Sequence, residues 1–153
     1  MTSLFSLLPD AVATVQAETK QEILDVLARR FSEVYELDAT EVLERLEERE
    51  KLGSTGFGRG VAIPHARVPG IKRPVAALLR LKDPVDFASA DAMPVELVFG
   101  LLSPENSGVA HLHALAAISR IVRDERMHEA FMDAPDAEAL RALVTNVTDR
   151  DAA

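Results

Sequence analysis

The sequence contains no cysteine among its 153 residues. It therefore has no thiol nucleophile, no disulfide and no cysteine-ligated zinc site. It also lacks any apolar run close to the roughly 18 residues that a membrane-spanning helix needs. The first ten residues, MTSLFSLLPD, include no lysine or arginine, and so lack the charged start of a signal peptide. These absences predict a cytoplasmic protein without a membrane segment.

Positive charge is also scarce. The chain has 17 lysines and arginines against 25 aspartates and glutamates, and its net charge is −8. Its basic residues are scattered rather than gathered in a stripe, which is a poor arrangement for binding the phosphate backbone of a nucleic acid. An acidic surface does suit docking to a basic protein partner. We therefore expect protein partners and no nucleic acid.

Apolar residues make up 48% of the chain, which is enough to form a core. The length predicts one domain over residues 1–153. Short apolar segments bounded by turn residues predict strands at 11–15, 60–64, 75–81 and 95–102. Helical spacing of apolar residues predicts helices at 20–35, from Asp38 to about Gly53, at 110–122, from Asp124, and at 136–144. This order predicts an α/β fold, with a sheet covered by helices on both faces.

The segment 49–67, REKLGSTGFGRGVAIPHAR, holds four of the seven glycines in the chain. Glycines at this density allow backbone N–H groups to converge on an anion. The alternative is a plain connector between a helix and a strand. The spacing G-x-G-x-G between a helix and a strand fits neither a P-loop nor a dinucleotide-binding turn. A phosphate held here is therefore expected on something other than a bound nucleotide.

His65 follows Pro64 at the predicted end of a strand, where a side chain can project into a crevice at the edge of an α/β sheet. A neutral imidazole is a competent nucleophile near neutral pH. The alternative is a partly buried polar residue at a strand end. Arg49 lies one turn before the glycine-rich segment and has no acidic residue three or four positions away. It is therefore either a solvated helix residue or an anion ligand.

The other histidines differ in their expected surroundings. His111 and His113 lie on one predicted helix and point roughly 160° apart, so they cannot chelate one metal ion together. That geometry argues against a metal hydrolase built on His111, His113 and an acidic residue. His128 lies between Met127 and Glu129 on a charged helix, and we expect it to be solvated.

Together these residues resemble a known family. The sequence supplies every fixed letter of R-E-x-L-G-S-T-G-x-G-x-G-x-A-I-P-H from Arg49 to His65, and of H-L-x-x-L from His111 to Leu115. It resembles the enzyme IIA domains of the fructose, mannitol and nitrogen-regulatory class of the bacterial phosphotransferase system, over essentially the whole chain. The resemblance implies a mixed β-sheet sandwiched between helical layers. A stand-alone chain is most similar to the nitrogen-regulatory type.

The resemblance also implies a function. His65 would accept a phosphoryl group from an HPr- or NPr-type phosphohistidine protein, with His111 and Arg49 lining the site and with neither metal nor cofactor. We expect the oxygens of that group to be held by a phosphoryl-binding loop comprising Ser54, Thr55, Gly56 and Gly58. The phosphorylation state would then regulate partner proteins. The alternatives are a soluble sugar-specific IIA that passes phosphate to a IIB component, and a catalytically silent interaction module.

Overall fold

A computed structural model describes residues 4–152, with side chains through residue 148. The predicted single domain includes residues 1–3 and 153, which lie outside the described part. A short 3-10 helix, η1, spans Pro9–Ala11. The strands are β1 (Val12–Val15), β2 (Gly56–Gly58), β3 (Val61–Ala62), β4 (His65–Val68), β5 (Val75–Val85) and β6 (Val95–Pro104). The helices are α1 (Lys20–Tyr35), α2 (Ala39–Lys51), α3 (Val109–Arg123), α4 (Glu125–Asp133) and α5 (Ala137–Ala152).

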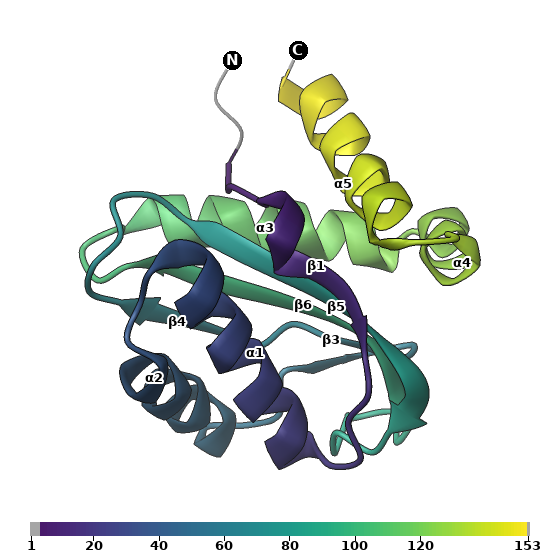
Figure 1. Cartoon of the computed structure of the whole chain (residues 1–153), viewed down its shortest axis with the longest axis horizontal. Helices are drawn as coiled ribbons and strands as arrows, with labels where there is room; N and C mark the ends of the chain where they lie inside the picture. Colours follow the sequence, from purple (N-terminus) through teal and green to yellow (C-terminus); the bar gives the residue numbers. More distant parts are fainter. Residues whose placement is uncertain (1–3, 153) are drawn as a thin grey trace.

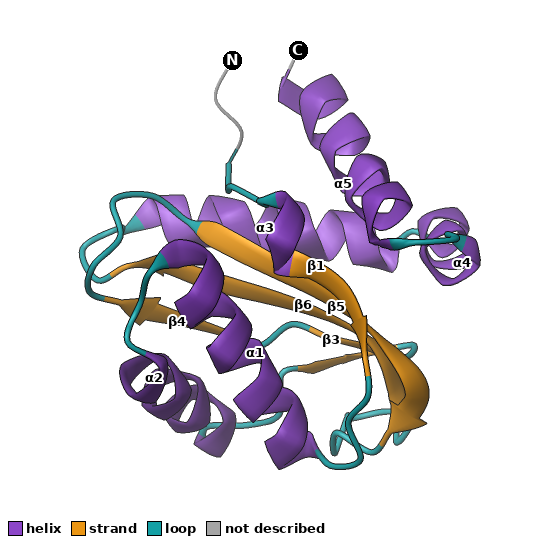
Figure 2. Ribbon diagram, in the orientation of Figure 1, coloured by secondary structure: helices purple, strands orange, loops and turns teal. Residues whose placement is uncertain are grey.

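The six strands form one mixed sheet in the order β1-β5-β6-β3-β2, and β4 also pairs with β6 (Figure 2). Strands β5 and β6 are antiparallel, whereas β1 pairs with β5 in parallel, as β3 and β4 do with β6. Helices α1 and α2 cover one face, and α3 and α5 lie against the other (Figure 1). The predicted α/β fold, a mixed sheet between helical layers, is confirmed. Among the described residues, no helix has both the length and the apolar character needed to cross a bilayer.

Local capping fixes the start of the first two helices. The hydroxyl of Thr19 accepts a hydrogen bond from the N–H of Glu22 at 3.1 Å, and so caps α1. The carboxylate of Asp38 accepts one from the N–H of Glu41 at 3.0 Å, and so caps α2. Each side chain satisfies a backbone N–H that has no partner within its helix. Both caps lie where the sequence pattern predicts them.

The predicted strand at 60–64 is wrong in one respect that bears on the site. It was expected to end at His65, but β3 ends at Ala62 and His65 begins β4. The interruption falls at Ile63 and Pro64. Proline has no N–H to donate to the ladder, and Pro64 bonds β6 only through its carbonyl oxygen, which accepts from the N–H of Leu101 at 3.0 Å. Strands β3 and β4 therefore pair with successive parts of β6, on either side of a break beside His65.

Alternation along β6 separates the two faces of the sheet. Gly100 faces α1, where a Cβ atom would lie 2.9 Å from both Cδ atoms of Leu27 and 3.0 Å from Phe31 Cε2. Ser103, three residues further along β6, lies on the opposite face, toward α3, and contacts His111. Leu27 and Phe31 are fully buried, so neither can move aside into solvent. The glycine lets α1 approach the sheet closely.

We expect Gly100→Ala to lower the free energy of unfolding by about 1–3 kcal/mol, because the added methyl group overpacks the contact with α1. Urea denaturation measures the change. In a Leu27→Ala background, where the space is available, the same substitution should cost much less. An equal cost in both backgrounds would contradict the steric explanation.

Candidate active site

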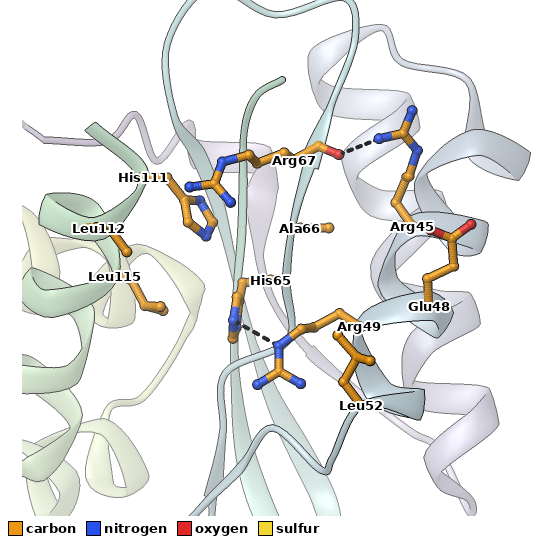
Figure 3. Close-up of a pocket in the computed structure, with 10 residues that line it drawn as sticks. All are labelled: Arg45, Glu48, Arg49, Leu52, His65, Ala66, Arg67, His111, Leu112 and Leu115. Atoms are coloured by element: carbon orange, nitrogen blue, oxygen red, sulfur yellow. Dashed lines mark hydrogen bonds between the residues drawn. The ribbon is translucent and has the colours of Figure 1, made fainter. Parts of the chain in front are cut away.

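A cavity of about 440 Å³ lies at the end of the sheet, between α2 and α3 (Figure 3). It brings together three residues that the sequence singled out: Arg49 from α2, His65 from β4 and His111 from α3. Ten side chains line it: Arg45, Glu48, Arg49, Leu52, His65, Ala66, Arg67, His111, Leu112 and Leu115. Three of these are arginines and one is a glutamate, so the lining is positively charged although the protein is acidic overall.

The two ring nitrogens of His65 have different partners. Nδ1 lies 2.7 Å from the carbonyl oxygen of Ile63. A carbonyl oxygen can only accept, so Nδ1 carries the proton and donates it. Nε2 lies 3.2 Å from Nε of Arg49, whose N–H is the donor. His65 is therefore neutral, with the lone pair of Nε2 facing the arginine.

The guanidinium of Arg49 has a second hydrogen-bonding partner. Its Nη1 donates to the carbonyl oxygen of Gly53 at 2.9 Å. Gly53 closes the last turn of α2 with a φ of 145°, a backbone conformation that other residues rarely adopt. The turn thus directs a carbonyl group back at the guanidinium. Arg49 is therefore an oriented side chain at the cavity and not a solvated helix residue.

His111 lies in the first turn of α3, behind His65. Its Nδ1 lies 2.7 Å from the hydroxyl oxygen of the fully buried Ser103. Among the described residues, that hydroxyl has no other hydrogen-bonding partner. Because an unused buried donor is costly, the hydroxyl donates to Nδ1, and the proton of His111 is on Nε2. The rings of His65 and His111 are 5.7 Å apart between centroids and inclined at 44°.

Both histidines are held in the neutral form. Burial is the main cause that lowers the pKa of His65, and the charges of Arg49 and Arg67 act in the same direction. Burial is the main cause that lowers the pKa of His111 to about 4, and the charge of Arg67 acts in the same direction. A neutral His65 keeps its lone pair available at physiological pH.

The structure does not bring the predicted phosphoryl-binding loop to this cavity. Ser54, Thr55, Gly56 and Gly58 do not line it. The hydroxyl of Ser54 donates to Phe87 O at 2.9 Å. The N–H of Thr55 donates to the carboxylate of Glu50 at 3.0 Å, and the hydroxyl of Thr55 donates to the same carboxylate. These donors hold the loop to the body of the protein, and a phosphoryl-binding role for them stays a prediction.

Glu50 is the residue that organises this loop. It is a fixed letter of the motif from Arg49 to His65, but the sequence reasoning assigned it no role. Its side chain is only 7% exposed, and it also forms an ion pair with Lys20, 2.9 Å away at the start of α1. A buried carboxylate is costly unless it is paired and hydrogen-bonded. By taking three donors, Glu50 ties the end of α2 to α1 and to the loop, next to Arg49.

The two remaining histidines lie away from the cavity. His113 is exposed on α3, while His111 is buried. The two-histidine ligand set of the metal hydrolase alternative is therefore absent, and no group of three or more potential metal ligands occurs within the described residues. The expectation that His128 is solvated is wrong. It is half-buried and its Nε2 lies 2.9 Å from the carboxylate of Glu96, a contact between α4 and β6.

Two cavity residues, Arg45 and Arg67, were missed by the sequence reasoning. Arg45 pairs with Glu41 at 3.0 Å and with Glu105 at 2.6 Å. Its i, i+4 spacing to Glu41 was the available signal for that pair. Arg67 lies two residues after His65, and alternation along a strand would have placed both on one face.

Comparisons with known proteins identify the family of the chain. The sequence matches the family described as "Phosphoenolpyruvate-dependent sugar phosphotransferase system, EIIA 2" over residues 7–147. The chain belongs to this EIIA family. It is 41% identical, over 138 residues and 90% of each chain, to a protein of Pseudomonas aeruginosa named "Nitrogen regulatory protein". The resemblance identified from the sequence, including its nitrogen-regulatory subtype, is confirmed.

Solved EIIA structures share the fold. The crystal structure of Nitrogen Regulatory Protein IIA-Ntr from Neisseria meningitidis superposes with a TM-score of 0.84 at 35% identity, covering 90% of this chain and 95% of that one. IIA mannitol from Escherichia coli superposes with a TM-score of 0.76 at 19% identity, covering 92% and 99%. The second comparison supports the fold alone.

The lowered pKa of His111 predicts a pH dependence of stability. Because the folded pKa, about 4, is below the ordinary value of 6.5, the unfolded chain takes up the proton first as the pH falls. Stability should therefore decline from about pH 6.5 and level off near pH 4. The shift corresponds to about 2–3 kcal/mol in the free energy of unfolding.

Urea denaturation between pH 7 and pH 4 of the wild type and of His111→Asn isolates this contribution as the difference between the two curves. Over that pH range, the free energy of unfolding of His111→Asn should fall by about 2–3 kcal/mol less than that of the wild type. His113→Asn, an exposed change on the same helix, serves as the control and should follow the wild type. Parallel curves for His111→Asn and the wild type would show that His111 does not titrate in this way.

Proposed function

We propose that this EIIA protein accepts a phosphoryl group on Nε2 of His65 from an HPr- or NPr-type phosphohistidine protein, and that its phosphorylation state regulates partner proteins. The observation that carries the proposal is the pair of hydrogen bonds at His65. The bond from Nδ1 to Ile63 O fixes the tautomer, and the second leaves the lone pair of Nε2 facing Arg49 at the cavity.

The transfer needs no proton to move. The lone pair of Nε2 attacks the phosphorus in line with the donor's nitrogen–phosphorus bond. As the new Nε2–P bond forms, the old bond breaks, and its electron pair stays on the donor's imidazole. The His65 ring gains positive charge in this step, and the hydrogen bond from Nδ1 to Ile63 O stabilises it. Because imidazoles are both the attacking and the leaving group, the mechanism uses no metal or cofactor.

The remaining residues stabilise charge on the phosphoryl oxygens. In most phosphoryl transfers the transition state is loose, so positioning and electrostatics supply most of the catalysis. Arg49 releases Nε2 of His65 when the phosphoryl group arrives. Because Gly53 still holds its Nη1, the guanidinium remains beside the oxygens and donates to them. The N–H of His111 Nε2 is a further donor, oriented by Ser103.

Incubation with enzyme I, an HPr-type carrier and phosphoenolpyruvate, followed by intact-mass analysis, tests the carrier function. We expect one phosphoryl group, labile in acid and stable in base, as for a phosphoramidate. His65→Ala should abolish it, because the attacking nitrogen is gone. His113→Ala, which removes an exposed imidazole outside the cavity, should label at the wild-type rate. Undiminished labelling of His65→Ala would refute the proposal.

Regulation is tested by comparing partners of the two forms. Phosphorylation adds about −1.5 to −2 charges at neutral pH, and desolvating an unpaired charge in an interface costs several kcal/mol. Each 1.4 kcal/mol is about tenfold in affinity. In a pull-down from cell extract, we expect the wild type and His65→Ala to differ in partners from the His65→Asp mimic.

The second candidate is a sugar-specific IIA, because the family description names a sugar phosphotransferase system. Identical partners for all three forms in the pull-down, together with rapid transfer of the phosphoryl group to a sugar-specific IIB, would favour that candidate over regulation. The labelling experiment does not distinguish the two, since both carry the group on His65.

A further inference from the structure

Arg67 is placed at the site by strand register. In the parallel pairing of β4 with β6, His65 lies opposite Leu101 and Arg67 opposite Ser103. Residues two apart on a strand share a face, and paired residues on neighbouring strands point to the same side. Since Ser103 contacts His111, Arg67 projects from the same face as His65, next to His111. Figure 3 shows its guanidinium beside the His111 ring.

The guanidinium of Arg67 is free to bind an anion. Its side chain is exposed and has no hydrogen bond or ion pair within the part of the chain that the structure describes. Its backbone, by contrast, is anchored, because Arg67 O accepts a hydrogen bond from Nη1 of Arg45 at 3.1 Å. Arg45 lines the same cavity but already has two carboxylate partners, Glu41 and Glu105.

The charge of Arg67 acts on both histidines, since it contributes to the lowered pKa of each. A guanidinium close enough to disfavour a cationic imidazole also favours an anion bound to that imidazole. Arg49 contacts His65 from α2, whereas Arg67 extends from β4 toward His111 (Figure 3). The cavity beside His65 is therefore lined by a guanidinium from each of these two elements.

We propose that Arg67 is a second phosphoryl-binding residue, which pairs through its guanidinium with oxygens of the phosphoryl group on His65 and complements Arg49. This role rests on the proposed phosphorylation of His65. Arg67 provides hydrogen-bond donors from strand β4. The glycine-rich loop does not bring its own donors to the cavity, because it is hydrogen-bonded to Glu50 and Phe87.

The test measures the phosphoryl group itself. The phosphorylated protein is titrated by ³¹P NMR above the pH at which phosphohistidine hydrolyses rapidly, for the wild type, Arg67→Gln and Arg120→Gln. Removing a nearby positive charge raises the pKa of the phosphoryl group, so Arg67→Gln should raise it. Arg120→Gln removes an exposed arginine of α3 that does not line the cavity, and should leave the phosphoryl pKa unchanged.

Transfer rates add a second readout. We expect Arg67→Gln to slow transfer from the HPr-type carrier by about tenfold, the typical effect of losing a charge-assisted hydrogen bond. Arg67→Lys keeps the charge but loses the planar fork, so its phosphoryl pKa should stay near the wild-type value while its transfer rate recovers only in part.

The outcomes separate this role from the proposed function. If the wild type takes up no phosphoryl group, the proposed function fails, and the role of Arg67 fails with it. If the wild type is labelled but Arg67→Gln has the wild-type phosphoryl pKa, the role of Arg67 alone is overturned. Slow transfer with an unchanged phosphoryl pKa would also overturn it, because Arg67 would then contact the donor protein and not the phosphoryl group.

Discussion

The hydrogen bond from His65 Nδ1 to the carbonyl oxygen of Ile63 is the constraint on which the site depends. It exists because the Ile63 carbonyl, two residues before the histidine, is not used by the neighbouring segment. The N–H of Ile63 donates to Thr55 O, but the N–H of Thr55 donates to the carboxylate of Glu50. The hydrogen bond to Ile63 selects the tautomer and decides which nitrogen of His65 faces the cavity.

The contacts around Arg49 connect the site to α2. The guanidinium is held between His65 and the turn at Gly53, and the neighbouring Glu50 fixes that turn to α1 and to the loop. The residues of the motif from Arg49 to His65 therefore have different structural roles. His65 and Arg49 face the cavity, whereas the glycines, Ser54 and Thr55 shape the path that the backbone takes between them.

Local features of the sequence were sufficient for much of the fold. Caps at Thr19 and Asp38 involve residues three positions apart, and the helices and most strands follow from periodicity. His65, Arg49 and His111 were identified through a family signature. Arg67 was missed because the predicted strand ended at His65, so the alternation along β4 was not considered. His128 was misjudged because its partner, Glu96, is 32 residues away in the chain. The contacts of Thr55 with Glu50 were not predicted, because no local pattern reveals them.

Helix α3 starts at Val109, directly after Gly108, and no side chain caps its first turn. The N-terminus of a helix carries a partial positive charge from its aligned peptide dipoles, and the effect is confined to the first turn. His111 lies in that turn, so the dipole opposes its protonation in the same direction as burial does. The element that supplies this imidazole therefore also helps to keep it an uncharged hydrogen-bond donor, and adds a fixed positive field to the end of the cavity where an anion would bind.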